Sequence, residues 1–413
     1  METHAIRGKR SLNSDIADRY RSVRSLSEAL VAPLSDADAT LQSMPDASPA
    51  KWHLAHTTWF FETFVLRDRL DGYRLFDDRW PYLFNSYYEA EGPRHARAER
   101  GMLSRPSLDE VLSYRAHVDA AMECMLDRSE AAGLIALGLA HEQQHQELLL
   151  TDIKHALFAN PLGPAFALPE DGSGRDDDSN EPAWLEYPGG IARIGHQGDG
   201  FAFDNEGPPH RILLEPFALS DRLVANADWE AFIADGGYCT PTLWLSDGWH
   251  WVEREQVEGP LYWRGDEHFT LSGWQPRNPN APVAHISYYE ADAFATWAGF
   301  RLPTEFEWEV IASSHDPHSG HQLDHARAIE PRGSSNLFGD CWQWTRSAYL
   351  PYPRFRPAEG AVGEYNGKFM SGQFVLRGAS CATPRGHSRA TYRNFFYPHQ
   401  RWQFTGLRLA KDV

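Results

Sequence analysis

Cysteine is scarce in this sequence, and no two cysteines stand close together. The four cysteines are spread over the chain without a C-x-x-C spacing: Cys124, Cys239, Cys341 and Cys381. A zinc ribbon or a dithiol redox motif needs such a pair, so the sequence excludes both. We expect four free thiols, as is usual in a reducing compartment.

The sequence also lacks an excess of basic residues and a long apolar run. Lys and Arg number 39 against 57 Asp and Glu, which gives a formal net charge of −18. Nucleic acids and anionic membranes attract clustered cations, so both are excluded as partners, and no protein partner is predicted. No stretch reaches the roughly 18 apolar residues of a membrane span. Because residues 1–20 are polar rather than signal-like, a cytoplasmic protein is predicted.

The first part of the chain has helical periodicity. Apolar residues recur at three- and four-residue spacing in four segments, 15–34, 48–70, 107–128 and 130–160. Ser107 and Glu110 have the spacing of a capping box at the start of the third segment. Four such segments predict an antiparallel four-helix bundle. The connection 77–106 is long for a turn between helices, so we expect a functional loop there.

The second part of the chain has a different composition. Residues 168–182 are acidic and rich in Gly and Ser, which is typical of a flexible linker. Beyond them, short strand-like runs alternate with Gly, Pro and Asn, and two short helical patterns interrupt them. We therefore predict an α+β multidomain protein with a helical bundle at 14–165, a linker at 166–182 and a mixed domain at 183–413.

The fourth helical segment carries the motif H-E-x-x-H. On a helix His141 and His145 lie one turn apart, so both imidazoles reach one metal ion. A zinc protease needs a third ligand downstream, but Thr151 stands where a histidine is expected, and His155 lies about 15 Å further along the axis. The surrounding leucines indicate a core-facing helix, where unpaired histidines are costly. A metal site in the bundle is predicted, and a merely polar helix face is the alternative.

The third ligand is expected from another helix of the bundle. The segment WHLAHTTWFFE offers His53 and His56, and the spacing does not choose between them. Three neutral imidazoles suit Zn, Fe, Cu or Ni about equally, so the residue types do not name the metal.

Several long motifs resemble those of one enzyme family. In chain order they are WHLAHTTWFFE, HEQQHQELLLTDIKH, LPTEFEWE, YNGKFMSGQFVLRGASCATP and RNFFYPHQRWQFTGLRLA. They span about residues 15–410 and are similar to the sulfoxide synthases of ergothioneine biosynthesis. The resemblance implies an N-terminal DinB-like four-helix bundle. It also implies a C-terminal domain like the formylglycine-generating enzyme, with a C-type-lectin-like fold.

The resemblance implies a mononuclear non-haem Fe(II) site held by His56, His141 and His145, and so favours His56 over His53. The reaction of the family joins hercynine, the trimethylated betaine of histidine, to a thiol. O₂ is the oxidant, and the sulfur ends as a sulfoxide.

Tyr87 and Tyr88 resemble the tandem tyrosines of family members that take free cysteine as the sulfur donor. A phenol in such a site can donate a proton, and the alternative is that both rings only pack the loop. Members that take γ-glutamylcysteine carry a Trp-Asp pair where this chain has Phe395 and Phe396. This departure favours L-cysteine or another small donor.

The resemblance also implies substrate contacts for Gln144 and Asn394. A surface amide is the alternative for Gln144. Arg94, Arg97 and Arg100 are candidates for pairing with a substrate carboxylate, and otherwise are surface charges of the loop.

Three aromatic residues near the end of the chain are candidates for a wall around the trimethylammonium group, namely Phe395, Phe396 and Trp402. A quaternary cation favours the faces of aromatic rings. The alternative is that the three side chains belong to the core.

Four other functions are alternatives. Selenoneine synthesis would join hercynine to a selenosugar at the same iron site. A formylglycine-generating oxidase needs a second cysteine close to Cys381, and the following CATPRGHSRA has none. A DinB-type thiol transferase would use zinc or nickel without O₂, and a lectin-like binding module would bind no iron.

Overall fold

The structure is a computed structural model that describes residues 2–168, 182–333, 335–357, 359, 363 and 366–413. It divides into two compact units. The first runs to Pro161 and takes in His325–Arg327, and the second holds most of the chain from Leu162 to Val413. Most of the segment predicted as a linker lies outside the described residues.

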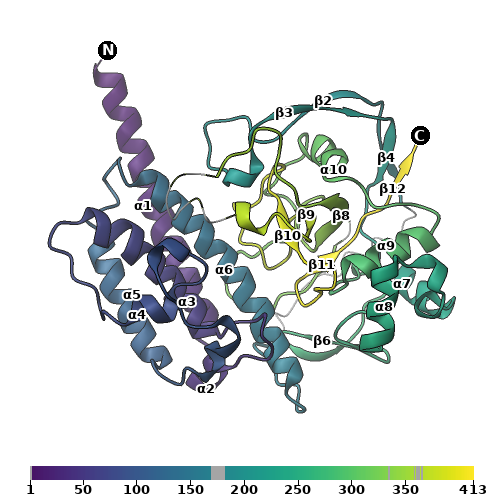
Figure 1. Cartoon of the computed structure of the whole chain (residues 1–413), viewed down its shortest axis with the longest axis horizontal. Coiled ribbons are helices and arrows are strands. Elements are labelled where there is room, and N and C mark those ends of the chain that lie inside the picture. Colours follow the sequence, from purple (N-terminus) through teal and green to yellow (C-terminus); the bar gives the residue numbers. More distant parts are fainter. Residues whose placement is uncertain (1, 169–181, 334, 358, 360–362, 364–365) are drawn as a thin grey trace. The chain divides into compact units, whose positions relative to one another are not determined.

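The first unit is a bundle of four long helices, drawn in purple to blue in Figure 1. They are α1 (Glu2–Val31), α3 (Ala50–Phe61), α5 (Leu108–Met122) and α6 (Ala132–Ala159). Helix α6 packs against α1 and α3, and α3 also packs against α5. The connections hold two short helices, α2 (Asp36–Thr40) and α4 (Trp80–Phe84). The four predicted helical segments are confirmed.

Helix α3 is the central helix of this bundle. All of its residues are buried, and the π-helical turn Glu62–Arg67 follows it directly. A helix that is buried all round must satisfy its polar side chains inside the protein. The histidines and carboxylates on and after α3 therefore need partners from neighbouring helices.

The buried carboxylate of Glu62 has such partners. Glu62 accepts hydrogen bonds from the hydroxyls of Tyr73 at 2.9 Å and Tyr114 at 2.5 Å. At the start of α5, the predicted capping box is confirmed, because the Ser107 hydroxyl accepts from the Glu110 N–H and the Glu110 carboxylate accepts from the Ser107 N–H.

In the residues that the structure describes, the second unit is built from short strands with four α-helices. One sheet has the order β10-β9-β8-β11, with bounds Asn394–Phe396, Phe374–Gly378, Trp342–Ala348 and Thr405–Gly406. A second has the order β1-β4-β12, with bounds Trp184–Tyr187, Phe217–Ser220 and Ala410–Asp412. The pairing of β11 with β8 is parallel, and the other pairs in these two sheets are antiparallel.

The remaining elements of this unit are short. Strands β2 (Gly190–Ile194) and β3 (His210–Leu214) form a hairpin, and β5 (Trp263–Arg264), β6 (Glu267–Thr270) and β7 (Gly273–Pro276) form an antiparallel sheet. The helices are α7 (Asn226–Ala234), α8 (Ser246–Glu255), α9 (Tyr288–Trp297) and α10 (Glu305–Ala312). Helices in one unit and mixed elements in the other confirm the predicted α+β class.

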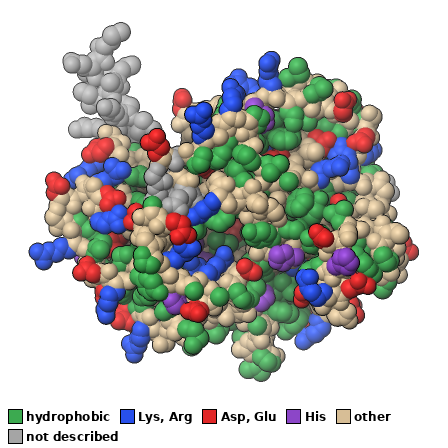
Figure 2. All heavy atoms as spheres, viewed as in Figure 1, with side chains coloured by type: hydrophobic (Ala, Val, Ile, Leu, Met, Phe, Trp, Pro, Cys, Tyr) green, Lys and Arg blue, Asp and Glu red, His purple; other side chains and the backbone are tan. Residues whose placement is uncertain are grey.

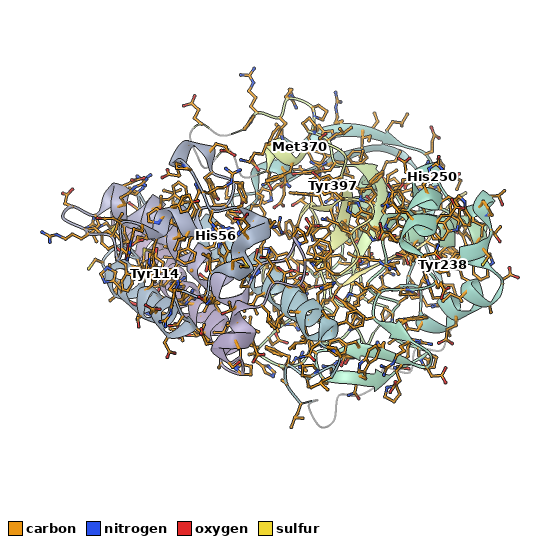
Figure 3. All side chains as sticks on the ribbon, turned by 60° about the horizontal axis from the view of Figure 1, so that its bottom comes forward. His56, Tyr114, Tyr238, His250, Met370 and Tyr397 are labelled. Atoms are coloured by element: carbon orange, nitrogen blue, oxygen red, sulfur yellow. The ribbon has the colours of Figure 1, made fainter. Side chains whose placement is uncertain are left out.

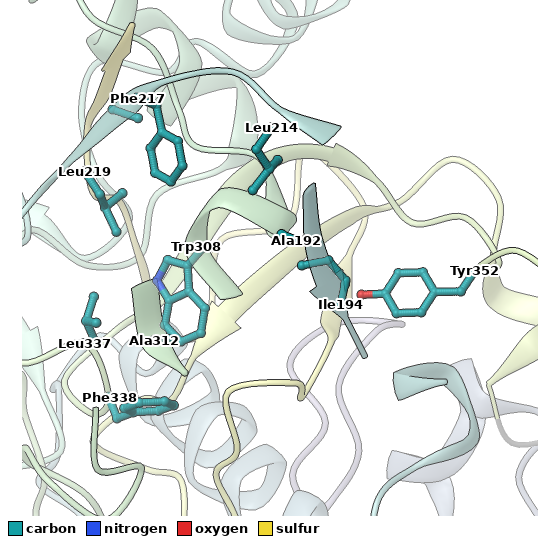
Figure 4. Close-up of a cluster of buried hydrophobic side chains, with 11 residues drawn as sticks. Ala192, Ile194, Leu214, Phe217, Leu219, Trp308, Ala312, Leu337, Phe338 and Tyr352 are labelled. Atoms are coloured by element: carbon teal, nitrogen blue, oxygen red, sulfur yellow. The ribbon is translucent and has the colours of Figure 1, made fainter. Parts of the chain in front are cut away.

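A hydrophobic cluster holds the second unit together (Figure 4). Trp308 of α10 is fully buried among Phe217, Leu219 and Phe338. Its indole N–H donates to the Gln343 side-chain oxygen at 2.7 Å. Burial of an indole is favourable when this one donor finds a partner, as it does here.

The exposed charges of the molecule are mixed in sign. On the face drawn in Figure 2, Lys and Arg side chains are interspersed with Asp and Glu. No helix in the described part of the chain is both long and apolar enough to span a membrane.

Candidate metal centre

Three histidines from two helices of the first unit converge. His56 lies on α3, and His141 and His145 lie one turn apart on α6. One imidazole nitrogen from each lies within 4.8 Å of the other two, and the described residues contain no second group of this kind. The ring centroids are 4.6–4.9 Å apart. Figure 3 labels His56 within the helices of this unit.

Two indoles and a carbonyl hold the ring of His56. The ring stacks on Trp52 at 4.6 Å and on Trp59 at 5.5 Å, in each case within 13° of parallel. Its Nδ1 lies 2.6 Å from the carbonyl oxygen of Phe84. A carbonyl only accepts, so Nδ1 carries the proton and Nε2 keeps its lone pair. This Nε2 is buried and has no hydrogen-bond partner among the described residues.

His53, the alternative third ligand, lies beside His145 and outside the triad. Its Nδ1 is 2.8 Å from Nδ1 of His145, and its Nε2 is 3.2 Å from the carboxylate of Asp152. Both of its ring nitrogens are thus engaged by protein groups. The structure brings His56, and not His53, into the group of three.

All three triad histidines are poor bases in the folded protein. Burial lowers the pKa of His141 to about 3, and it lowers the pKa values of His56 and His145 well below the usual range, helped by the neighbouring histidines. Neutral imidazoles are the form that binds metal ions. Three neutral nitrogen donors, one of them an orphaned buried atom, fit a divalent transition metal.

The glutamate of the H-E-x-x-H motif faces another part of the bundle. Glu142 accepts from Ser27 at 2.6 Å and from Arg24 at 2.9 Å, and it forms an ion pair with Arg115. Burial alone would raise the pKa of Glu142, but Arg115 and Arg24 hold it at about 2. A carboxylate held in this way does not serve as the general base of a zinc protease, so the motif has a different role here.

The two loop tyrosines also belong to the first unit. Tyr88 is fully buried and packs on Trp59 at 5.5 Å and on Phe64 at 5.2 Å. Tyr87 stacks on Tyr88 at 4.8 Å and is half-buried. Since Trp59 also stacks on His56, one aromatic cluster links Tyr88 to the triad.

Three further residues of this unit were predicted to contact substrate, namely Gln144, Arg94 and Arg97. Gln144 lies half-buried on α6, next to His145. Arg94 forms an ion pair with Glu89 at 2.6 Å, and Arg97 donates to the carbonyl oxygen of Asp46. Both arginines therefore already have partners within the fold.

The predicted aromatic wall lies in the second unit. Phe395 stacks on Tyr349 at 4.1 Å, and its neighbours Asn394 and Phe396 are half-buried on the same strand, β10. Successive residues of a strand point to opposite faces, so Phe395 and Phe396 do not line one face of β10. Trp402 is buried.

Two family models match the chain. Residues 19–149 match the DinB superfamily, and residues 172–327 match the sulfatase-modifying factor enzyme 1-like domain. The predicted DinB-like bundle and formylglycine-generating-enzyme-like domain are thereby confirmed.

Curated relatives cover different shares of the chain. A hercynine oxygenase of Mycolicibacterium thermoresistibile is 32% identical over 92% of this chain and 90% of its own length. Ergothioneine biosynthesis protein 1 of Schizosaccharomyces pombe is 28% identical over 51% of this chain and 28% of its own length. A formylglycine-generating enzyme of Thermomonospora curvata is 34% identical over 39% of this chain and 57% of its own length. The first match spans nearly all of both chains, so this protein is an oxidoreductase that belongs to the hercynine oxygenase family.

Proposed function

We propose that this protein is an Fe(II)- and O₂-dependent enzyme of ergothioneine biosynthesis that joins hercynine to L-cysteine and forms the hercynylcysteine sulfoxide. The observation that carries the proposal is the triad of neutral imidazoles contributed by α3 and α6, in which His56 and His141 are buried and His145 is half-buried. The names of the relatives support hercynine as the substrate.

The triad residues fit a site that retains open positions. His56, His141 and His145 would supply three nitrogen ligands, which would leave other coordination positions of the ion for substrates. When bound, Fe(II) would supply the redox chemistry with O₂ and favour the thiolate form of the donor. The protein side chains hold the rings in place and exclude water from two faces of His56, where the indoles of Trp52 and Trp59 stack.

Other side chains are proposed to handle substrate and protons. Gln144 would contact substrate beside His145, and Tyr87 or Tyr88 would donate a proton. In that case Tyr87→Phe and Tyr88→Phe change the ratio of C–S coupling to simple thiol oxidation, as measured by mass spectrometry of the products. Unchanged ratios in both variants would remove the tyrosines from the reaction.

The remaining predicted contacts stay proposals of the same kind, and they concern Asn394, Phe395, Phe396, Trp402, Arg94 and Arg97. Arg94 and Arg97 would have to exchange their present partners for a substrate carboxylate. The ring of Phe395, stacked on Tyr349, offers only one free face to a cation.

A donor screen tests the substrate assignment. Iron-loaded protein is incubated with hercynine and O₂, and L-cysteine, γ-glutamylcysteine or a selenosugar is added. We expect the hercynylcysteine sulfoxide from L-cysteine as the main product by mass spectrometry. A main product that contains selenium would favour selenoneine synthesis. The absence of O₂ uptake with every donor would contradict the proposed O₂-dependent reaction.

Substitution in the triad tests the metal centre. We expect His141→Ala to lose at least about a hundredfold in metal affinity, together with turnover, because only two of the three nitrogens remain. The matched control is His117→Ala on α5, whose ring packs on Tyr73 and Phe76. Metal content measured after gel filtration should fall only in the first variant. Retention of metal and activity by His141→Ala would contradict the ligand assignment.

A further inference from the structure

Two buried polar residues, His53 and Asp152, form a row of contacts that starts at His145. Asp152, seven residues later on α6, holds His53 of α3 through its carboxylate, and His53 in turn contacts His145. His53 and Asp152 are 3% and 5% exposed. Neither residue belongs to the group of three converging nitrogens, yet the two connect that group to a charge.

With Asp152 ionised and His53 neutral, the donors and acceptors in this row allow one arrangement of protons. The ionised carboxylate of Asp152 only accepts, so Nε2 of His53 carries a proton. In a neutral imidazole the other nitrogen is then an acceptor, so Nδ1 of His53 accepts from Nδ1–H of His145. His145 is left with its lone pair on Nε2.

The carboxylate of Asp152 has a further hydrogen-bond partner in Ser48. The same carboxylate oxygen accepts from the backbone N–H of Ser48 at 2.8 Å, and the Ser48 hydroxyl accepts from Arg100 at 2.9 Å. Arg100 is buried with its guanidinium 3.3 Å from the centre of the Trp52 ring. Ser48 thus connects the carboxylate of Asp152 to a buried guanidinium.

We propose that His53 and Asp152 are positioning residues that fix the tautomer and ring orientation of His145 for metal binding. The inference rests on the proposed metal centre and adds a function for two residues outside it. Carboxylate–histidine contacts of this kind typically change metal affinity by about 10- to 100-fold. His56 needs no such row, because the carbonyl oxygen of Phe84 fixes its tautomer directly.

Metal titration of the apoprotein tests the proposal. Co(II) serves as the probe, with its visible absorption band and its electron paramagnetic resonance spectrum as readouts that do not depend on turnover. His53→Leu removes the acceptor and keeps the volume, whereas His53→Asn keeps an oxygen near the position of Nδ1. We expect Co(II) affinity to fall about 10- to 100-fold in His53→Leu and to recover in part in His53→Asn.

Two further variants complete the design. Asp152→Asn removes the charge and leaves His53 in place, and it should weaken Co(II) binding and alter the spectrum in the same direction as His53→Leu. His155→Gln is the matched control, because His155 lies on the same helix but contacts Ser43 at 2.7 Å. Its Co(II) affinity should remain within about threefold of the wild type, well short of the effect expected for a positioning residue.

The outcomes separate this inference from the proposed function. Wild-type protein that takes up no Co(II) would overturn the metal centre and the inference with it. Wild-type binding with affinity and spectrum preserved in folded His53→Leu and Asp152→Asn would overturn only the positioning role.

Discussion

The protonation of three imidazoles decides whether the triad can bind a metal. An ordinary histidine has a pKa near 6.5. In the folded protein, burial lowers the pKa of His141 to about 3 and those of His56 and His145 well below the usual range. At a pH between the lowered folded-state pKa and 6.5, these histidines bind protons in the unfolded chain but not in the folded chain. The free energy of unfolding of the apoprotein should therefore fall as the pH drops below about 6.5.

The pH dependence can be assigned to a single residue. For each histidine with so low a pKa, the free energy of unfolding falls by up to ~1.4 kcal/mol for each pH unit below about 6.5. Urea unfolding in the presence of chelator, between pH 6 and pH 5, should show a shallower loss of stability in His141→Asn than in the wild type by about this amount. Equal slopes would mean that His141 titrates normally in the folded protein.

At the same scale, spacing and resemblance predicted the three converging histidines, and the contact of His53 with His145 was not predicted. A hydrogen bond between two imidazoles depends on how closely α3 approaches α6, and sequence spacing carries no such distance. One signal was available: Asp152 stands seven residues after His145, which places both on one face of a helix after two turns.

At the scale of helices and strands, the features that depend only on residues close in sequence were predicted correctly. The capping box at Ser107 is an example, since both of its hydrogen bonds form within one turn. The π-helical turn Glu62–Arg67 was predicted as ordinary helix, because the apolar periodicity of a sequence does not distinguish a single π-helical turn from α-helix. The short strands of the second unit were predicted as strand-like runs, whereas their order in the sheets depends on contacts between distant segments.

An ion-pair network joins helix α10 to strand β9 in the second unit. Glu305 of α10 lies 2.9 Å from Arg377 of β9 and 2.8 Å from Arg393. Glu309 also pairs with Arg377, at 2.8 Å. All of these side chains are at most 5% exposed, so the loss of one carboxylate leaves a buried guanidinium short of a partner.

Glu305→Gln should therefore destabilise the second unit by about 3–5 kcal/mol. The matched control is Glu267→Gln, whose exposed pair with Arg264 should contribute less than ~1 kcal/mol. Calorimetric unfolding of both variants at neutral pH gives the comparison. Equal losses would show that burial of the network does not set its contribution.

At the scale of the whole molecule, the composition makes a prediction about the connection between the parts. The acidic stretch 168–182 is rich in Gly and Ser, so we expect proteases to cut there first. A glutamate-specific protease should cut at Glu170 or Glu181 and give two fragments that resist further digestion. Cleavage spread over glutamates of the helices and strands would contradict this organisation.

The orphaned Nε2 of His56 has a consequence for the stability and degradation of the protein in a cell. A buried acceptor without a partner costs about 1–3 kcal/mol, and an ion at that nitrogen removes the cost. Binding at a hundredfold excess over the dissociation constant stabilises the folded protein by about 2.7 kcal/mol in total, a figure that already includes the relief of this cost. Newly made copies that meet no metal would thus unfold more often and be degraded sooner, so that the supply of the ion would set the abundance of the enzyme as well as its activity.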